Sequence, residues 1–420
     1  MDLGRNRSNL KIAWEKIMSK NSITPIKFKS FLNHWSYTRL KEVKDVRDGT
    51  HSSPKYIDNG YPLVTSKNLT DSGLNLNDVS LISESDYNEI NKRSKVEVGD
   101  ILLGLIGTIG KPVLVEIDGF SIKNVGLIKN GGKIQNQFLL QYLKTNLFNK
   151  YIQIEMAGNT QKFLGLETLR NTKVPVPSPE EQSAIGSLFR TLDDLLSSYK
   201  DNLANYQSLK ATMLSKMFPK AGQTVPEIRL DGFEGEWEIK KFKSISTKRG
   251  KSNSKGYDYP AYSVSNQSGL IPQSEQFEGS RLGNLEKTSY KIVEPNEFAY
   301  NPARINVGSI AFNDLDETVI VSSLYVIFSL DKSINNNYAL LFINSPEFNK
   351  EVRRNTEGSV REYLFYENFA NIRIPIPPTF EEQCFIGSYF SNLDNLINSH
   401  QEKISQLETF KKKLLQDMFI

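Results

Sequence analysis

The glycine-rich stretch Gly104–Pro112 comes nearest in this chain to a nucleotide-binding motif. A phosphate loop of the form Gly-x-x-x-x-Gly-Lys-Ser/Thr needs a first glycine for the backbone cradle and a final hydroxyl for Mg²⁺. At those two positions the chain has Leu105 and Pro112. We therefore interpret the stretch as a glycine-rich turn between strands.

The other reactive side chains do not assemble a catalytic or metal site. Tyr300–Ala303 shares two residues with the Asn-Pro-Pro-Tyr loop of amino-methyltransferases, but the matching cofactor motif Phe-x-Gly-x-Gly is missing. The single Cys384 is at a helix start, where a structural thiol is the simpler interpretation. The histidines, His34, His51 and His400, are far apart in sequence, and we interpret His400 as a packed residue. We expect no catalytic residue, no metal site and no cofactor, which favours a binding protein.

Composition indicates a cytoplasmic protein. The chain has 420 residues, 38% hydrophobic and 24% charged, and a net charge of +4. No apolar run approaches the ~18 residues of a membrane span. The N-terminus lacks the apolar segment of a signal peptide. Basic residues gather between Lys240 and Lys255, a run without any acid that could face phosphate: Lys240, Lys241, Lys243, Lys248, Arg249, Lys251 and Lys255.

The segments that would position a binding surface occur twice. Glu180-Glu181-Gln182 returns as Glu381-Glu382-Gln383, an offset of 201 residues that continues without a gap. The matched positions after these triplets are Ile185/Ile386, Gly186/Gly387, Phe189/Phe390, Leu192/Leu393, Asp193/Asp394 and Phe218/Phe419. Each copy follows an extended proline-rich exit, at Val174–Pro177 and Ile374–Pro377. This pattern indicates an internal duplication.

Each repeated segment has the heptad pattern of a coiled-coil helix. Every seventh residue is apolar with one exception, His400, in two seams: Ile185, Leu192, Tyr199, Tyr206 and Met213, then Ile386, Leu393, His400, Leu407 and Leu414. The seams most simply bury each other. A helix of about 37 residues is about 55 Å long, which exceeds the ~34 Å of one turn of B-DNA.

Two globular segments with matching landmarks precede these helices. Trp35 is matched by Trp237, and the helical run 138–148 by 338–348, while the sequences between landmarks differ. We expect five parts: an N-terminal helix at 1–22, a first domain at 23–178, a central helix at 179–219, a second domain at 220–379 and a C-terminal helix at 380–420. We also expect the first of these, through Leu10–Met18, to pack beside the end of the last, near Met418.

The order of these features resembles the specificity subunit of type I restriction–modification systems. The supporting phrases in the first half are Asp48-Gly49-Thr50-His51, Gly99-Asp100-Ile101-Leu102 and Gly107–Lys111. In the second half they are Tyr262–Asn266, Tyr300-Asn301-Pro302 and Gly308-Ser309-Ile310. Each phrase alone is weak, but their order within a duplicated frame is specific.

The resemblance implies a fold and a role. The fold is a mixed α/β (α+β) one, with two similar target-recognition domains and two long antiparallel helices as a spacer. The role is non-catalytic: each domain reads one half of an asymmetric bipartite site in double-stranded DNA. The implied partners are two methyltransferase subunits, which use S-adenosylmethionine on adenine, and two ATP-driven motor-nuclease subunits. No membrane partner is implied.

Base reading requires polar or cationic side chains on protruding loops. In the first domain the candidates are His51, Lys55, Lys67, Asn68, Thr108, Lys111, Gln161 and Lys162. In the second domain they are Lys248, Arg249, Lys251, Asn266, Gln267, Arg281, Asn301, Arg304 and Arg361. We expect Asn301 and Arg304 to be the most structural, because their phrase has tight-turn chemistry. Two alternatives are a coiled-coil scaffold that does not bind DNA and a fused methyltransferase, which the missing cofactor loop disfavours.

Overall fold

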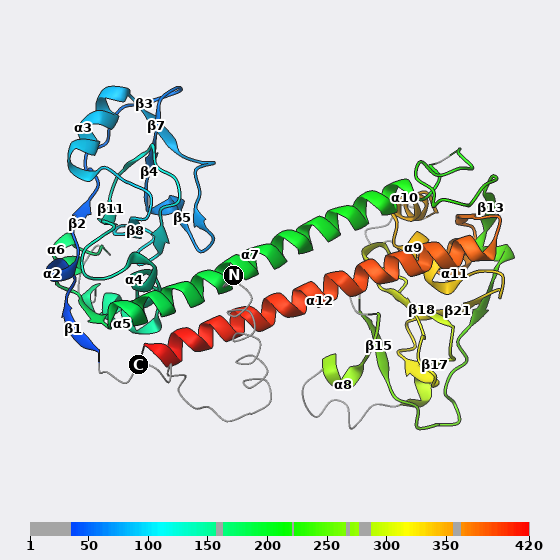
Figure 1. Ribbon diagram of the computed structural model, residues 1–420. Coiled ribbons are helices and arrows are strands. Elements are labelled where there is room, and N and C mark those ends of the chain that lie inside the picture. The colour runs from blue at the N-terminus through cyan, green and yellow to red at the C-terminus, as the bar shows by residue number, and fades with distance from the viewer. Residues whose placement is uncertain are drawn as a thin grey trace. The chain divides into compact units, whose positions relative to one another are not determined.

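The computed structural model describes residues 35–156, 163–220, 222–265, 269–276, 287–355 and 363–419 (Figure 1). They divide into two compact units: the first joins the chain up to Tyr199 to the segment from Lys403 onwards, and the second is Lys200–Glu402. The helices α7 (Pro179–Lys216) and α12 (Phe380–Met418) confirm the two predicted long helices. Each contributes one end to each unit. The predicted N-terminal helix, residues 1–22, lies outside the described residues.

The first unit is built on two four-stranded sheets. One is antiparallel, in the order β2 (Val46–Asp48), β11 (Val125–Ile128), β8 (Ile101–Gly104), β9 (Pro112–Leu114). The other runs β10 (Ser121–Ile122), β4 (Tyr61–Val64), β7 (Ser80–Ile82), β3 (Tyr56–Ile57). Two-stranded pairs are β1 (Ser36–Arg39) with β12 (Lys173–Val176) and β5 (Leu69–Thr70) with β6 (Gly73–Leu74). The helices are α2 (Leu40–Val43), η1 (Ser66–Asn68), α3 (Glu84–Ser94), α4 (Asn136–Leu143), α5 (Asn146–Met156) and α6 (Leu166–Asn171).

The second unit repeats the first sheet with the same antiparallel order. Its strands are β14 (Ser246–Arg249), β21 (Val326–Leu330), β18 (Phe298–Tyr300) and β19 (Ile310–Phe312). The pairs are β13 (Glu238–Lys241) with β22 (Arg373–Ile376), β15 (Tyr262–Ser265) with β16 (Gly269–Pro272), and β17 (Lys291–Val293) with β20 (Val319–Val321). The helices are η2 (Phe242–Ser244), α8 (Gln273–Gln276), η4 (Lys287–Ser289), η5 (Ile305–Val307), α9 (Asn336–Ile343), α10 (Pro346–Asn355) and α11 (Tyr366–Phe369). The mixed α+β class and the internal repeat are thereby confirmed.

The repeated Glu-Glu-Gln triplet joins each long helix to its unit. Oε1 of the buried Gln182 accepts a hydrogen bond of 2.8 Å from the backbone N of Gln135, just before α4. Oε1 of Gln383 accepts one of 2.9 Å from the backbone N of Asn335, just before α9. One turn later, a Cβ on Gly186 would lie 3.0 Å from Gln137. The glutamine therefore binds a backbone donor that the short helix leaves unpaired at its start, and glycine lets the two helices approach closely.

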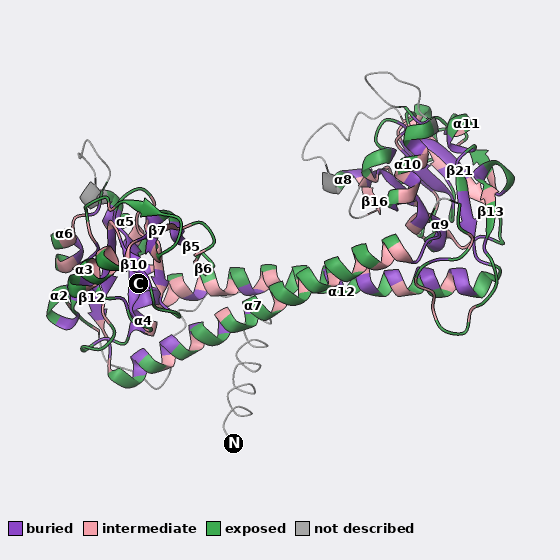
Figure 2. Ribbon diagram, turned by 90° about the horizontal axis from the view of Figure 1, so that it is seen from above, coloured by how far each residue is buried: buried purple, intermediate pink, exposed green. Residues whose placement is uncertain are grey.

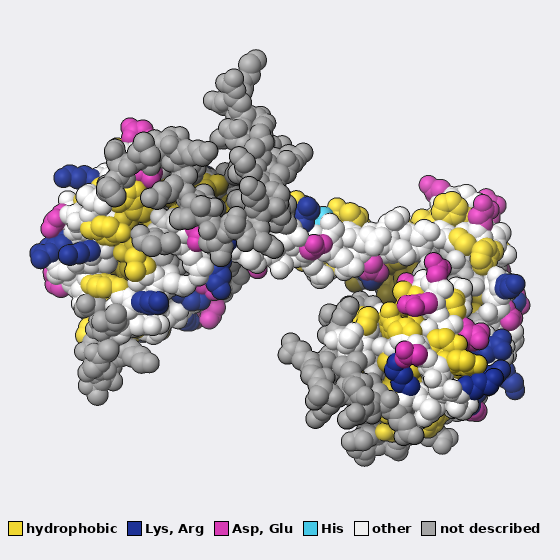
Figure 3. Space-filling model, turned by 90° about the horizontal axis from the view of Figure 1, so that it is seen from below, with side chains coloured by type: hydrophobic (Ala, Val, Ile, Leu, Met, Phe, Trp, Pro, Cys, Tyr) yellow, Lys and Arg dark blue, Asp and Glu magenta, His cyan; other side chains and the backbone are white. Residues whose placement is uncertain are grey.

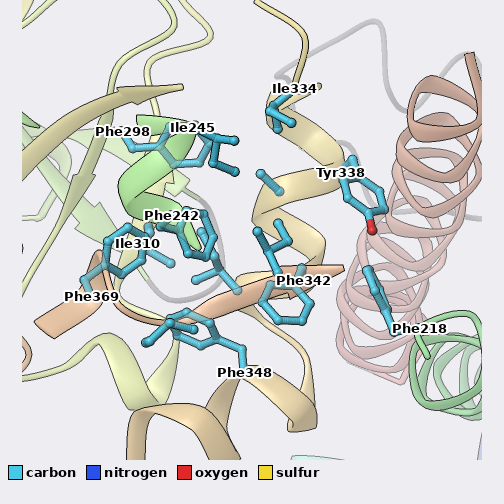
Figure 4. Packing of buried hydrophobic residues seen from close by; sticks show 14 of the residues in the cluster. Phe218, Phe242, Ile245, Phe298, Ile310, Ile334, Tyr338, Phe342, Phe348 and Phe369 are labelled. Atoms are coloured by element: carbon cyan, nitrogen blue, oxygen red, sulfur yellow. The ribbon is translucent and has the colours of Figure 1, made fainter. Parts of the chain in front are cut away.

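The far end of each long helix completes the core of a unit. Phe218, just after α7, packs against Tyr338 with ring centroids 5.6 Å apart (Figure 4). It also packs against Trp237, with ring centroids 6.3 Å apart. Phe419, just after α12, packs against Trp35 and Phe138 at 5.6 and 5.5 Å. The first unit therefore takes a core residue from the C-terminal end of the chain. That arrangement agrees with the matched positions Trp35/Trp237 of the sequence repeat.

Ion pairs between the long helices show the same repeat. Within the second unit, Lys210 pairs with Asp394. Within the first, Lys411 pairs with Asp193, the same two positions shifted by the repeat length. His400 stacks edge-on against Tyr206, with 5.2 Å between ring centroids, so this histidine is packed in the seam.

The heptad seam is unevenly buried along α7. Ile185 and Leu192 are buried in the first unit, whereas Tyr199, Tyr206 and Met213 are half-buried (Figure 2). The helix therefore gains most of its apolar burial from the body of a unit and less from the seam itself.

The predicted helical run 138–148 is wrong in one respect, because it is broken into α4 and α5. The hydroxyl of Thr145 accepts a hydrogen bond from the backbone N of Phe148 and starts the second helix. Ser345 does the same for Phe348 in the second unit. Such a hydroxyl cap is favourable at a helix start and allows a sharp change of direction.

Candidate nucleic-acid interface

In the first unit, the end of β2 carries a buried carboxylate that binds two exposed side chains. The side chain of Asp48 is 6% exposed, whereas those of His51 and Arg93 are 61% and 64% exposed. One oxygen of Asp48 lies 2.9 Å from Nε2 of His51, and the other accepts a hydrogen bond from Nη2 of Arg93. Arg93 is in the last turn of α3, which packs beside β2. Three separate elements therefore meet at Asp48.

His51 is held at both ring nitrogens. Its Nδ1 lies 2.9 Å from Oδ1 of Asn124, a residue with a positive φ of 55° between β10 and β11. Both ring nitrogens are engaged within the unit, and the role of His51 as a base reader stays a prediction. Beside it, Lys123 donates to Ser53 at 2.6 Å, and Lys55 is exposed.

Asn68 also uses its side chain within the first unit, and its role as a base reader stays a prediction. It is buried, and its Oδ1 accepts hydrogen bonds from the backbone N and the hydroxyl of Thr65. Its Nδ2 donates to the carbonyls of Asn75 and Asp78. Both ends of the amide are therefore engaged within the unit. Its neighbour Lys67 stays exposed and pairs with Asp78 at 3.3 Å.

The glycine-rich stretch is a turn between β8 and β9, as predicted. A Cβ on Gly104 would lie 1.8 Å from the carbonyl oxygen of Thr108, so this turn requires glycine. Thr108 is half-buried, and Lys111 pairs with Asp71 at 3.2 Å. The backbone N of Leu164 donates to Leu105 O, which brings the chain after residue 162 to the same turn. The candidates Gln161 and Lys162 lie outside the described residues.

In the second unit, the basic run Lys240–Lys255 includes strand β14. Lys248 donates to Glu367 at 2.7 Å, and its ammonium lies 5.8 Å from the centre of the Tyr366 ring. That hydrogen bond lowers the pKa of the Glu367 carboxyl. Arg249 donates to the hydroxyl of Ser329 at 3.0 Å, and Lys251 is exposed. These cations lie on or just after an outer strand of the sheet, the kind of site from which a side chain can reach a groove.

Asn301 and Arg304 share a turn but differ in what they expose. Oδ1 of Asn301 accepts a hydrogen bond from the backbone N of Ala303 at 3.0 Å, so Asn301 is a turn residue, as predicted. Arg304 contributes its backbone to the same turn, while its side chain is exposed. The remaining candidates of this unit lie outside the described residues: Asn266, Gln267, Arg281 and Arg361.

An internal carboxylate in each unit is compensated differently. In the first, buried Asp100 receives hydrogen bonds from Lys129 Nζ at 2.6 Å and from the backbone N of Asn130 at 2.7 Å. In the second, burial raises the pKa of Glu297, whose nearest cation, Arg249, is 3.7 Å away. The two carboxylates therefore have cation partners at different distances.

Sequence reasoning missed Arg93 and Lys123. Arg93 follows Lys92 at the end of a polar helix, where basic residues commonly favour the helix dipole, so nothing local distinguishes it. Only the fold brings it to Asp48, 45 positions earlier.

The surface of both units mixes charge signs. On the face drawn in Figure 3, Lys and Arg side chains alternate with acidic and apolar ones. Within the described ranges, no group of three or more His, Cys, Asp or Glu side chains could hold a metal ion. Among those residues there is also no helix long and apolar enough to cross a bilayer.

Comparison with known proteins identifies the repeated unit. The family described as the type I restriction modification DNA specificity domain matches residues 33–205 and again 234–409. The MjaIX specificity subunit of Methanocaldococcus jannaschii is 23% identical over 97% of this chain and 96% of its own length. The MjaVIII subunit of the same organism is 22% identical over 77% and 79%.

A solved structure agrees in fold. The S subunit of a type I restriction–modification system from M. genitalium superposes with a TM-score of 0.60 at 14% identity, over 95% of this chain and 99% of that one. The scaffold alternative finds no support in these matches. The chain therefore belongs to the type I restriction–modification DNA specificity family and is a specificity subunit with two target-recognition domains.

Proposed function

We propose that the two units read the two halves of an asymmetric, bipartite site in double-stranded DNA. The observation that carries this proposal is one sheet position whose side chain differs between the two units. Arg47 pairs with Leu127 and Arg249 pairs with Ile327 at the equivalent register, so the next position is Asp48 in the first unit and Gly250 in the second. A repeated frame with a different side chain at the same corner suits two different half-sites, since sequence is read by side-chain chemistry at base edges.

The long helices have the second role in the proposal. They set the gap between the half-sites and offer a docking surface for two methyltransferase subunits, which carry out adenine methylation with S-adenosylmethionine. Two ATP-driven motor-nuclease subunits complete the restriction complex. The chain itself is non-catalytic in this scheme. Because its substrate is cellular DNA, the proposed place of action is the cytoplasm.

A domain exchange tests the modular reading. Residues 31–177 are replaced by the corresponding segment of another specificity subunit, and adenine methylation is mapped across the genome of cells that carry the complex. We expect one half of the methylated motif to change. The donor segment must keep aromatic residues at the places of Trp35 and Phe138, because Phe419 packs on both.

Change in both halves would contradict independent reading by the two units. A salt series on the assembled complex gives a second check, because phosphate contacts release counterions and make affinity fall with salt. A flat response would count against DNA binding.

A further inference from the structure

The Asp48 cluster differs from an ordinary surface ion pair. Its carboxylate is almost fully buried, and both of its oxygens are used, one by His51 and one by Arg93. A buried carboxylate is costly unless it is paired and hydrogen-bonded. The exposed cation is therefore tied to a fixed point of the sheet, since β2 pairs with β11 at Asp48 and Gly126.

The fixed point is itself held from the other side. His51 bridges from Asp48 to Asn124, and this contact holds the carboxylate so that its other oxygen points to Arg93. The backbone carbonyl of Arg93 also accepts a hydrogen bond of 3.3 Å from Nη1 of Arg47. The end of α3 is therefore bound to β2 through both its backbone and its side chain.

Most of the Arg93 guanidinium remains available. An arginine has five N–H donors, and among the described residues only Asp48 contacts this side chain. At 64% exposure, the rest of the planar fork faces solvent. An oriented guanidinium with free donors matches the two acceptors O6 and N7 that guanine presents in the major groove.

We propose that Arg93 is a guanine-reading residue of the first target-recognition domain and that Asp48 is its positioning residue. The inference rests on the proposed function and names a contact within it. A phosphate contact needs only charge, and it tolerates a mobile side chain. The buried carboxylate instead fixes the orientation of the fork, which favours recognition of a base edge over the backbone. At the equivalent sheet position the second unit has Gly250, which offers no carboxylate to hold a cation.

The test compares three variants in the complete complex: Arg93→Ala, Arg93→Lys and Asp48→Asn. The matched control is Lys92→Ala, which removes one positive charge from the neighbouring exposed residue of the same helix. Methylation is mapped in cells, and affinity is measured with DNA that carries the wild-type motif or single base-pair changes. Thermal unfolding of each variant is recorded alongside.

We expect Arg93→Ala and Arg93→Lys to reduce discrimination at one G·C pair of one half-site by roughly tenfold to a hundredfold, the range for a bidentate arginine–guanine contact. The other half-site should not change. Asp48→Asn gives the sharpest result, because it adds net positive charge. It should raise affinity for unrelated DNA while it lowers discrimination at the same base pair.

Three results would overturn the inference. One is unchanged discrimination in Arg93→Ala, with or without a lower melting temperature, which would make the pair purely structural. Another is weaker binding to all sequences with a shallower salt dependence, which would make Arg93 a phosphate contact. The third is a wild-type half-site without a G·C pair. A wild-type complex that methylates no bipartite motif would instead refute the proposed function.

Discussion

Two kinds of site are repeated in the two units, one closely and one loosely. The helix joints are the contacts between each Glu-Glu-Gln triplet and its unit, and the sheet corners are the C-terminal ends of β2 and β14. At the joints, Gln182 and Gln383 bind the backbone N of Gln135 and Asn335 at 2.8 and 2.9 Å. At the corners, the position after the shared arginine (Arg47 or Arg249) holds the buried acid Asp48 in the first unit and Gly250 in the second. The two joints keep the same hydrogen bond, whereas the two corners carry different side chains.

The difference is physical. A joint must satisfy a backbone donor and admit a close helix contact, so a change of one atom leaves a buried group unpaired. The side chains around a corner, such as His51 and Arg93, are exposed, and substitutions of exposed residues usually cost little. A duplicated chain can therefore keep its joints and vary its corners, which suits a protein that reads two unlike half-sites.

The largest expected effect comes from the aromatic residues that complete each core. We expect Phe419→Ala to destabilise the first unit and Phe218→Ala the second, each by about 3–5 kcal/mol, because a buried ring leaves a cavity. Hydrogen exchange measured by mass spectrometry locates the effect. Faster exchange in 338–343 for Phe419→Ala would contradict the assignment of that residue to the first unit.

The next largest effect is expected from an ion pair that is present at the joint of the second unit. Arg229 donates to both carboxylate oxygens of buried Glu382, each at 2.8 Å, whereas Glu181 has no ion-pair partner among the described residues. Arg229→Ala should cost about 3–5 kcal/mol, because it leaves a buried charge unpaired. Calorimetric unfolding of this variant and of the control Glu181→Gln checks the asymmetry. Equal losses for both would remove it.

The glutamines test whether the joints are equivalent. Gln182→Ala and Gln383→Ala should each cost about 1–3 kcal/mol, since each leaves a buried backbone donor without its partner. Urea unfolding of the two variants measures the costs side by side. A cost near zero for one glutamine would show that its joint relies on other contacts.

The smallest expected effect is a pH dependence to which Lys44 of the first unit contributes. Burial, opposed by the charge of Asp100, lowers the pKa of Lys44 from 10.5 to about 8. Between those two values the unfolded chain binds more protons at Lys44, so stability should rise with pH across that window. The rise should be smaller in Lys44→Met. Burial also lowers the pKa of Lys144 in the first unit and of Lys291 in the second, so part of the rise should remain in that variant.

Much of the fold could be predicted because it depends on local and periodic signals. The offset of 201 residues and the heptads indicated two long helices and two similar domains, and the structure has them at Pro179–Lys216 and Phe380–Met418. The break between α4 and α5 was missed, although Thr145 and Ser345 are ordinary capping residues. The apolar residues keep a helical spacing across the break, so the sequence pattern gave no sign of it.

The candidate site was less predictable, because the type of a residue does not determine whether its side chain is exposed or which partner it pairs with. Asn68 and His51 have the side chains of base readers, yet their polar atoms are used within the unit. No neighbouring residue in the sequence distinguishes Arg93, and only the fold of the sheet brings its partner Asp48 close to it.

The sequence alone determined the repeat, the helices and the family, since periodicity and order survive in one dimension. Only the tertiary structure decided that Phe419 completes the first unit, that Phe218 completes the second, and that Arg93 is held on Asp48. Each of these contacts joins residues far apart along the chain. Such contacts form only when the whole unit folds, because the burial of apolar surface and the pairing of buried charge depend on all of its segments.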